Sequence, residues 1–186
     1  MASINGIQLK AIKTTRGMEG TGFTANIYLD GKKAGEVFDT ADGGCYNYSY
    51  CDDEKKQKVI ERIKEHFVKH PPVDTFKLYN TPIEKIDMGN LPHEEYLDML
   101  EPEDCFFSEL YALTLREKDY KKNCKKGYPV LVYIDFLHAK GSPRPLPITF
   151  SCVPEYDYMQ KFEEEKKKSK LAYMEVYKGV KDFEKE

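Results

Sequence analysis

The sequence predicts a single α+β domain, in which an antiparallel or mixed sheet packs with three to four helices. Apolar residues alternate with polar ones through most of the first 50 residues, which is the period of a strand. Two later stretches, 53–70 and 102–126, instead repeat their apolar residues at helical spacing. Because strands and helices are grouped rather than alternating one by one, the order argues against a wound parallel sheet.

The first part of the chain, about 1–70, is predicted to be rich in strands. Residues 7–11 alternate, and residues 23–29 do so more clearly. Asp30 and Gly31 follow, and both tolerate the positive φ that a tight hairpin turn requires. The returning strand is then expected over 32–40, and a tyrosine-rich fourth strand over 45–51.

The first helix is expected to begin at Asp52 or Asp53. Val59, Ile63 and Phe67 form its apolar stripe, and the two prolines at 71–72 end it. A helical middle, about 92–127, should contain a short piece over 93–100 and a longer helix. The longer helix starts at Pro102, has acidic residues in its first turn and lysines in its last, and stops near Gly127.

The last part, about 128–180, is predicted to have the order β-β-α-β. Residues 130–136 are apolar at nearly every position, which is typical of a central strand covered on both faces. Residues 146–153 should pair back with it, a short helix should begin at Pro154, and 171–177 should form the last strand. No linker or internal repeat separates these parts, so we expect one domain over 1–186.

Composition indicates an intracellular globular protein. The 186 residues are 40% hydrophobic and 33% charged, which is ordinary for a folded domain. Five cysteines are an odd number without a CxxC pair, so we expect reduced thiols rather than a disulfide framework. No apolar run is long enough to cross a membrane, and the first ten residues lack the layout of a secretory signal.

Asp135 and His138 are the strongest candidates for catalysis, because a carboxylate and an imidazole at a strand end suit a small metal-dependent hydrolase or nuclease. Residues three apart in a strand point to opposite faces, however, unless the strand ends or bulges between them. That spacing favours ordinary hydrogen bonding for Asp135 and solvation for His138. The sequence therefore assigns no catalytic residue, cofactor or metal.

The segment 84–109 carries nine acidic residues and one lysine, interspersed with apolar side chains. One interpretation is a solvated amphipathic helix and loop. The other is a negative surface with apolar anchors that binds a basic protein partner. On that second interpretation the partner-facing residues are Glu94, Glu95, Asp98, Glu103 and Asp104.

A cluster of lysines at the end of the long helix favours a further alternative, a non-specific nucleic-acid-binding protein, since lysines neutralise phosphates without reading bases. An isoelectric point near 5.9 lacks the basic bias of a dedicated binder, and solvated helix ends explain lysines equally well. The residues of this cluster are Lys121, Lys122, Lys125 and Lys126.

The segment 6–44, with its hairpin and glycine-rich turns, resembles small accessory proteins of bacterial phages and mobile elements. Some of these are anti-CRISPR proteins, including inhibitors of Cas9. The resemblance implies a non-enzymatic inhibitor in the cytoplasm of a bacterial host, with Cas9 or its guide complex as the partner. It covers about a quarter of the chain and assigns no functional residue, yet it makes protein binding our leading hypothesis.

Overall fold

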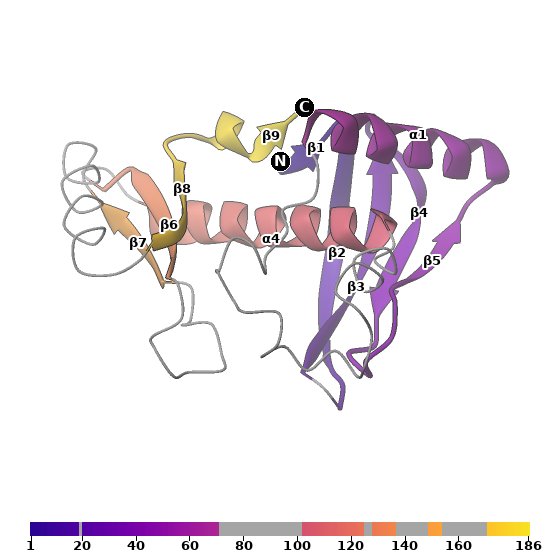
Figure 1. Cartoon of the computed structure of the whole chain (residues 1–186), viewed down its shortest axis with the longest axis horizontal. Coiled ribbons are helices and arrows are strands. Elements are labelled where there is room, and N and C mark those ends of the chain that lie inside the picture. The colour runs from indigo at the N-terminus through magenta and orange to yellow at the C-terminus, as the bar shows by residue number, and fades with distance from the viewer. Residues whose placement is uncertain (19, 71–101, 125–127, 137–148, 154–170) are drawn as a thin grey trace, which may run out of the picture. The chain divides into compact units, whose positions relative to one another are not determined.

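The computed structural model describes residues 1–18, 20–70, 102–124, 128–136, 149–153 and 171–186 (Figure 1). Contacts group the chain into two compact units, which we describe separately. Unit 1 draws its described residues from Met1–Pro72, Glu94–Leu115 and Phe183–Glu186. Unit 2 draws its described residues from Arg116–Asp182. The expectation of one domain over the whole chain stays a prediction.

Unit 1 is built on a mixed six-stranded sheet with the order β5-β4-β3-β2-β1-β9. Neighbours from β1 to β5 pair antiparallel, whereas β1 and β9 pair parallel through Ser3–Glu184 and Ile4–Lys185. The predicted α+β class and mixed sheet are thus confirmed. The strands are β1 (Ser3–Ile4), β2 (Ile7–Arg16), β3 (Thr21–Leu29), β4 (Lys32–Asp39), β5 (Asn47–Tyr50) and β9 (Glu184–Lys185).

The two faces of this sheet differ sharply in burial. Leu9 pairs with Ile27, and Ala25 pairs with Val37, and all four are buried on what we call the inner face. This outcome confirms the alternation predicted for 23–29. The hairpin at Asp30 and Gly31 is also confirmed, because both residues adopt positive φ, 48° and 79°.

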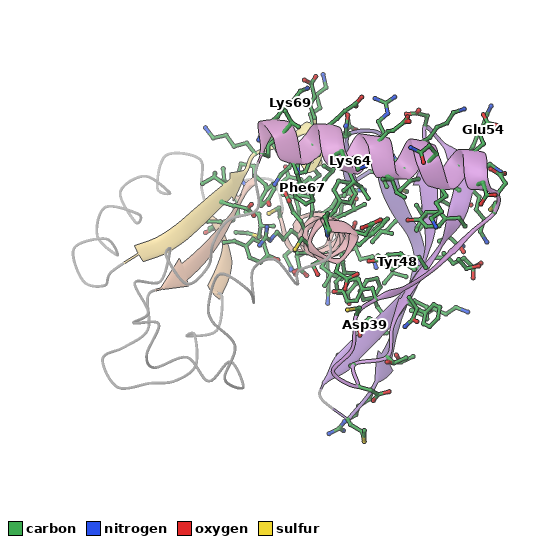
Figure 2. The ribbon with its side chains drawn as sticks, turned by 45° about the vertical axis from the view of Figure 1, so that its right-hand side comes forward. Asp39, Tyr48, Glu54, Lys64, Phe67 and Lys69 are labelled. Atoms are coloured by element: carbon green, nitrogen blue, oxygen red, sulfur yellow. The ribbon has the colours of Figure 1, made fainter. Side chains whose placement is uncertain are left out.

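Helix α1 (Asp53–Lys69) runs across the strands of unit 1 (Figure 1). Asp52 caps it, since its side chain accepts a hydrogen bond from the Lys55 backbone N–H at 2.8 Å. Figure 2 shows Glu54 near the start of this helix and Lys69 at its end. Of the predicted stripe, Val59 and Ile63 are buried, and Phe67 is half-buried.

Helix α4 (Pro102–Asn123) begins in unit 1, where its first half adds four large side chains to the core formed by the sheet and α1. Phe106, Phe107, Leu110 and Leu113 are fully buried. They meet aromatic residues of the inner sheet face: the Phe107 ring lies 5.5 Å from that of Tyr48. One turn later, Tyr111 stacks on Phe23 at a centroid distance of 4.0 Å.

Unit 2 contains a three-stranded antiparallel sheet with the order β7-β6-β8, made of β6 (Val130–Phe136), β7 (Thr149–Val153) and β8 (Leu171–Tyr177). Its central strand is β6, as predicted, and four consecutive residues of that strand, 130–133, are buried. The second half of α4 joins this sheet, since the Tyr133 hydroxyl donates to Asp119 at 2.6 Å. A short 3-10 helix, η2 (Val180–Phe183), follows β8.

The predicted number of helices is not matched. The described residues contain two α-helices, α1 and α4, where three to four were expected. The other two segments predicted to be helical, 93–100 and the one beginning at Pro154, lie outside the described residues. No helix among the described residues is both long and apolar enough to cross a membrane.

The packing of unit 1 predicts a large effect for Phe107→Ala. Its fully buried ring fills the space between α4 and Tyr48, so truncation should lower the free energy of unfolding by about 3–5 kcal/mol. Urea titration followed by circular dichroism measures this. Val68→Ala, on an 85% exposed residue of α1, is the control and should change it by less than about 0.5 kcal/mol. Equal effects would contradict the assigned core.

Candidate functional site

The outer face of the unit 1 sheet is the candidate site, because none of the described helices covers it. Strand pairing aligns Lys10, Asn26, Glu36 and Ser49 in one row across four strands. A parallel row holds Lys13, Thr24, Phe38 and Asn47. Every residue of both rows is exposed or half-exposed.

A β-bulge brings the two lysines of these rows to the same face. Residues three apart normally point to opposite faces, but the pairing of β2 with β3 shifts between Lys10 and Lys13. Two residues of β2, Ala11 and Ile12, therefore lie opposite the single residue Ala25. Ala11 has a φ of 53°, a left-handed conformation that is costly for alanine. The strained backbone of Ala11 therefore lies in the bulge that turns Lys13 to the same face as Lys10.

A hollow of about 260 Å³ lies beside this bulge. Its polar lining comes from Lys13, Thr24, Asn26 and Glu36, and Phe38 supplies an aromatic ring that is 38% exposed. The hollow therefore offers one cation, one carboxylate, a hydroxyl, an amide and an apolar surface. Such a set can hold a ligand by hydrogen bonds and ion pairs on an apolar anchor.

Two charged residues at this face, Glu36 and Lys10, contact neighbouring side chains. Lys33 donates a hydrogen bond to Glu36 at 2.6 Å, which raises the pKa of the Lys33 ammonium. The Lys10 ammonium lies 4.2 Å from the centre of the Tyr28 ring, a cation–π contact. Because Lys10 is half-exposed, this charge can still pair with an acidic ligand.

Two of the five predicted partner-facing acids are described, and Asp104 is used inside unit 1. One carboxylate oxygen accepts the Tyr46 backbone N–H at 3.0 Å, and the other accepts a short hydrogen bond from the Tyr48 hydroxyl. Burial and this carboxylate raise the pKa of Tyr48 well above its usual range. Figure 2 labels Tyr48, a residue of strand β5.

Glu103 is half-buried, and its charge contributes to the raised pKa of Tyr50 after burial itself. The other three acids, Glu94, Glu95 and Asp98, lie outside the described residues. The partner-facing role of the five therefore stays a prediction. For Asp104 the structure adds a structural role, because its carboxylate joins the start of α4 to β5 and the residue before it.

The predicted lysine cluster is placed only in part. Lys121 pairs with the buried Glu117 one turn earlier in α4, at 2.6 Å, and Lys122 is exposed. Lys125 and Lys126 lie outside the described residues. The structure thus leaves the nucleic-acid-binding role of these four residues as a prediction.

Asp135 and His138, the candidate pair of the alternative hydrolase hypothesis, are only partly described. Asp135 lies in β6, opposite Tyr173 of β8, and the strand pairing becomes irregular directly after it. His138 lies outside the described residues. Among the residues that the structure describes, no three histidine, cysteine or acidic side chains are grouped as metal ligands.

Unit 2 contains a polar cluster that sequence analysis did not find. Arg116 of α4 donates a short hydrogen bond to Glu175 of β8, and the Tyr177 hydroxyl donates to the same carboxylate. Both partners of the ion pair are largely buried, with side chains 14% and 16% exposed. Burial and Glu175 raise the pKa of Tyr177 far above normal. Arg116 and Glu175 are far apart in the sequence, so no local pattern could predict their contact. Their ion pair links helix α4 to strand β8, which is a structural role.

Comparison with known proteins found no matching family model, no matching curated protein and no matching solved structure.

The contacts of Asp104 predict that Asp104→Asn lowers the free energy of unfolding by about 1–3 kcal/mol, because Tyr48 and the Tyr46 N–H lose a charged acceptor. The adjacent Glu103→Gln is the matched control, and its unfolding free energy should stay close to that of the parent chain. Chemical denaturation at neutral pH measures both. If the Asp104 variant is as stable as the control, the structural role assigned to Asp104 is wrong.

The buried hydroxyl of Tyr50 predicts that the stability of the fold decreases at alkaline pH. Its hydroxyl is buried without a hydrogen-bond partner among the described residues, and burial raises its pKa to about 12 from about 10. The folded state therefore favours the neutral phenol. Stability from this group is complete below pH 10 and is lost as the pH rises towards 12. Thermal melts across this range should fall less steeply for Tyr50→Phe than for the parent chain, and parallel curves would rule this source out.

Proposed function

We propose that this chain is a non-enzymatic binding protein that contacts a protein partner through the outer face of its unit 1 sheet. The observation that carries the proposal is the strained bulge at Ala11, which aims Lys10 and Lys13 to the same face beside a hollow. Strained backbone persists only where the surrounding structure holds it, and it is concentrated at binding and catalytic sites.

The chemistry of the face favours a protein segment over a phosphate backbone. The face carries a carboxylate, Glu36, among its lysines, and the chain as a whole carries a net charge of −3, so it lacks the uniformly basic surface that suits a phosphate backbone. A peptide segment can instead present an acidic side chain to Lys10 and Lys13 and a donor to Glu36. An apolar side chain of the same segment would pack on Phe38.

The size of the hollow fits the same partner. About 260 Å³ lies just below the roughly 300–1,000 Å³ of typical small-molecule pockets. Such a space accepts one or two side chains rather than a whole cofactor. It therefore suits an anchor residue of a protein surface, with the neighbouring polar rows forming the rim.

The resemblance of segment 6–44 to accessory proteins of phages and mobile elements supports Cas9 and its guide complex, in a bacterial cytoplasm, as the first partner to test. Within this proposal the acidic residues Glu94, Glu95, Asp98 and Glu103 form a second contact region for a basic groove. Asp104 contributes less to it, since its carboxylate is engaged by Tyr46 and Tyr48.

The test is a titration of the full chain into a Cas9–guide DNA-cleavage assay, with a face variant and a charge-matched control. The double variant Lys10→Glu/Lys13→Glu reverses the two cations of the outer face. The control Lys56→Glu/Lys64→Glu makes the same change of charge on exposed positions of α1, where Figure 2 labels Lys64.

We expect inhibition that saturates near stoichiometric protein. The face variant should weaken it by at least about tenfold, because two attractive charge pairs become repulsive, and the control should not. Equal loss in both variants would overturn the outer face as the contact surface. No inhibition, and no binding to the complex, would remove Cas9 as the partner.

The cleavage assay and a DNA-shift assay separate the alternatives. Inhibition far below stoichiometry that disappears in Asp135→Ala would indicate catalysis and contradict the proposal. A shift of labelled DNA at low salt that is lost in Lys121→Glu/Lys122→Glu would indicate nucleic-acid binding through the lysine cluster.

A further inference from the structure

Two cysteines of unit 2 lie closer together than their sequence positions suggest. Cys124 directly follows α4, and Cys152 lies in β7, an edge strand of the three-stranded sheet. They are 28 residues apart in the chain, yet their Sγ atoms lie 2.8 Å apart. A disulfide bond is about 2.05 Å long, so less than one ångström of approach separates these thiols from bonding distance.

Regular structure holds both sulfurs in place. The Cys124 backbone N–H donates to the Tyr120 carbonyl at 2.9 Å, which continues the hydrogen bonding of α4. Cys152 pairs with Leu131 of the buried central strand β6. Both cysteine side chains are partly exposed, so a small oxidant can reach them.

The other three cysteines are placed differently. Cys45 and Cys51 are exposed, and Cys105 is half-buried with a thiol pKa raised by burial and by Asp104. No other pair of sulfurs among the described residues makes such a contact. Selective chemistry at Cys124 and Cys152 would therefore come from proximity rather than from exposure.

We propose that Cys124 and Cys152 are a redox modification site, at which a peroxide converts the two thiols into an intramolecular disulfide. The overall step is the loss of one hydrogen from each thiol and the reduction of one hydrogen peroxide to two waters. Two electrons leave the sulfur pair and enter the O–O bond, so the step balances without a metal or a cofactor.

The reaction proceeds in two steps at the contact between the two sulfurs. One thiol of the pair attacks the peroxide and becomes a sulfenic acid, with release of one water. The other sulfur attacks the sulfenic sulfur, the S–S bond forms, and the second water leaves with the proton of the attacking thiol.

The disulfide would link the end of α4 covalently to β7. In the reduced chain these sulfurs share only a weak hydrogen-bond contact. Cross-linking restricts the unfolded chain, so the oxidised protein should melt at a higher temperature than the reduced one. The inference does not depend on the proposed binding face, which lies in unit 1.

The test uses the full-length chain, first reduced and freed of reductant, then treated with hydrogen peroxide under native conditions. Remaining thiols are alkylated after unfolding, and the digest is mapped by mass spectrometry. We expect a cross-linked pair of peptides containing Cys124 and Cys152, lighter by two hydrogen atoms than the sum of the reduced peptides. The other three cysteines should be recovered mainly alkylated.

Variants and an unfolded control make the result decisive. Cys124→Ser and Cys152→Ser should each abolish the cross-link and the rise in melting temperature, whereas Cys51→Ser and Cys105→Ser should keep both. The cross-link should form at least about tenfold faster in the folded chain than in urea, because the fold raises the effective concentration of the two thiols.

Three outcomes would overturn the proposal. One is a dominant disulfide between other cysteines, such as Cys45 and Cys51. Another is oxidation of Cys124 or Cys152 to sulfinic or sulfonic acid without formation of the cross-link. The third is a cross-linking rate in urea equal to that of the folded chain, which would show that the native contact does not direct the chemistry.

Discussion

Coverage of one sheet face by the first half of α4 is the constraint on which unit 1 depends. Phe106, Phe107 and Leu110 have no exposed surface, and the rings of Phe23 and Tyr48 meet this helix from the sheet. A sheet that packs helices on one face leaves the other face to solvent or to a partner. The inner face therefore supplies the stability of the unit, and the outer face is left to carry polar and charged residues with little cost to folding.

Charge along the sequence is a poor guide to charge at a surface, as Asp104 demonstrates. In the sequence it is one of nine acids in a run, and it looks like solvated or partner-facing charge. In the structure both of its oxygens accept hydrogen bonds from the segment 46–48. A carboxylate in this position joins the helix start to the edge of the sheet. The useful question about a charge run is therefore which of its members already have partners within the fold.

Sequence patterns predicted the elements whose signal is local. The alternation at 23–29, the hairpin at Asp30 and Gly31, the start of α1 and the central place of β6 all follow from neighbouring residues. Features that depend on distant or irregular pairing could not be predicted. The bulge at Ala11 contains no glycine, so the sequence does not indicate its positive φ. Strand β9, at the other end of the chain, pairs with β1. The contact of Cys124 with Cys152 likewise exists only after β7 has paired with β6.

The two parts of the proposed binding face contribute differently to recognition. Exposed lysines such as Lys10 and Lys13 mainly accelerate and orient the encounter with an acidic segment, and salt screens their effect. Affinity has to come from desolvated contact, which at this face means the ring of Phe38 and the hollow beside it. Because that apolar area is small, the face by itself suits a transient complex. A tight complex would require a second contact region on the same chain, a role that our proposal gives to acidic residues of the segment 84–109.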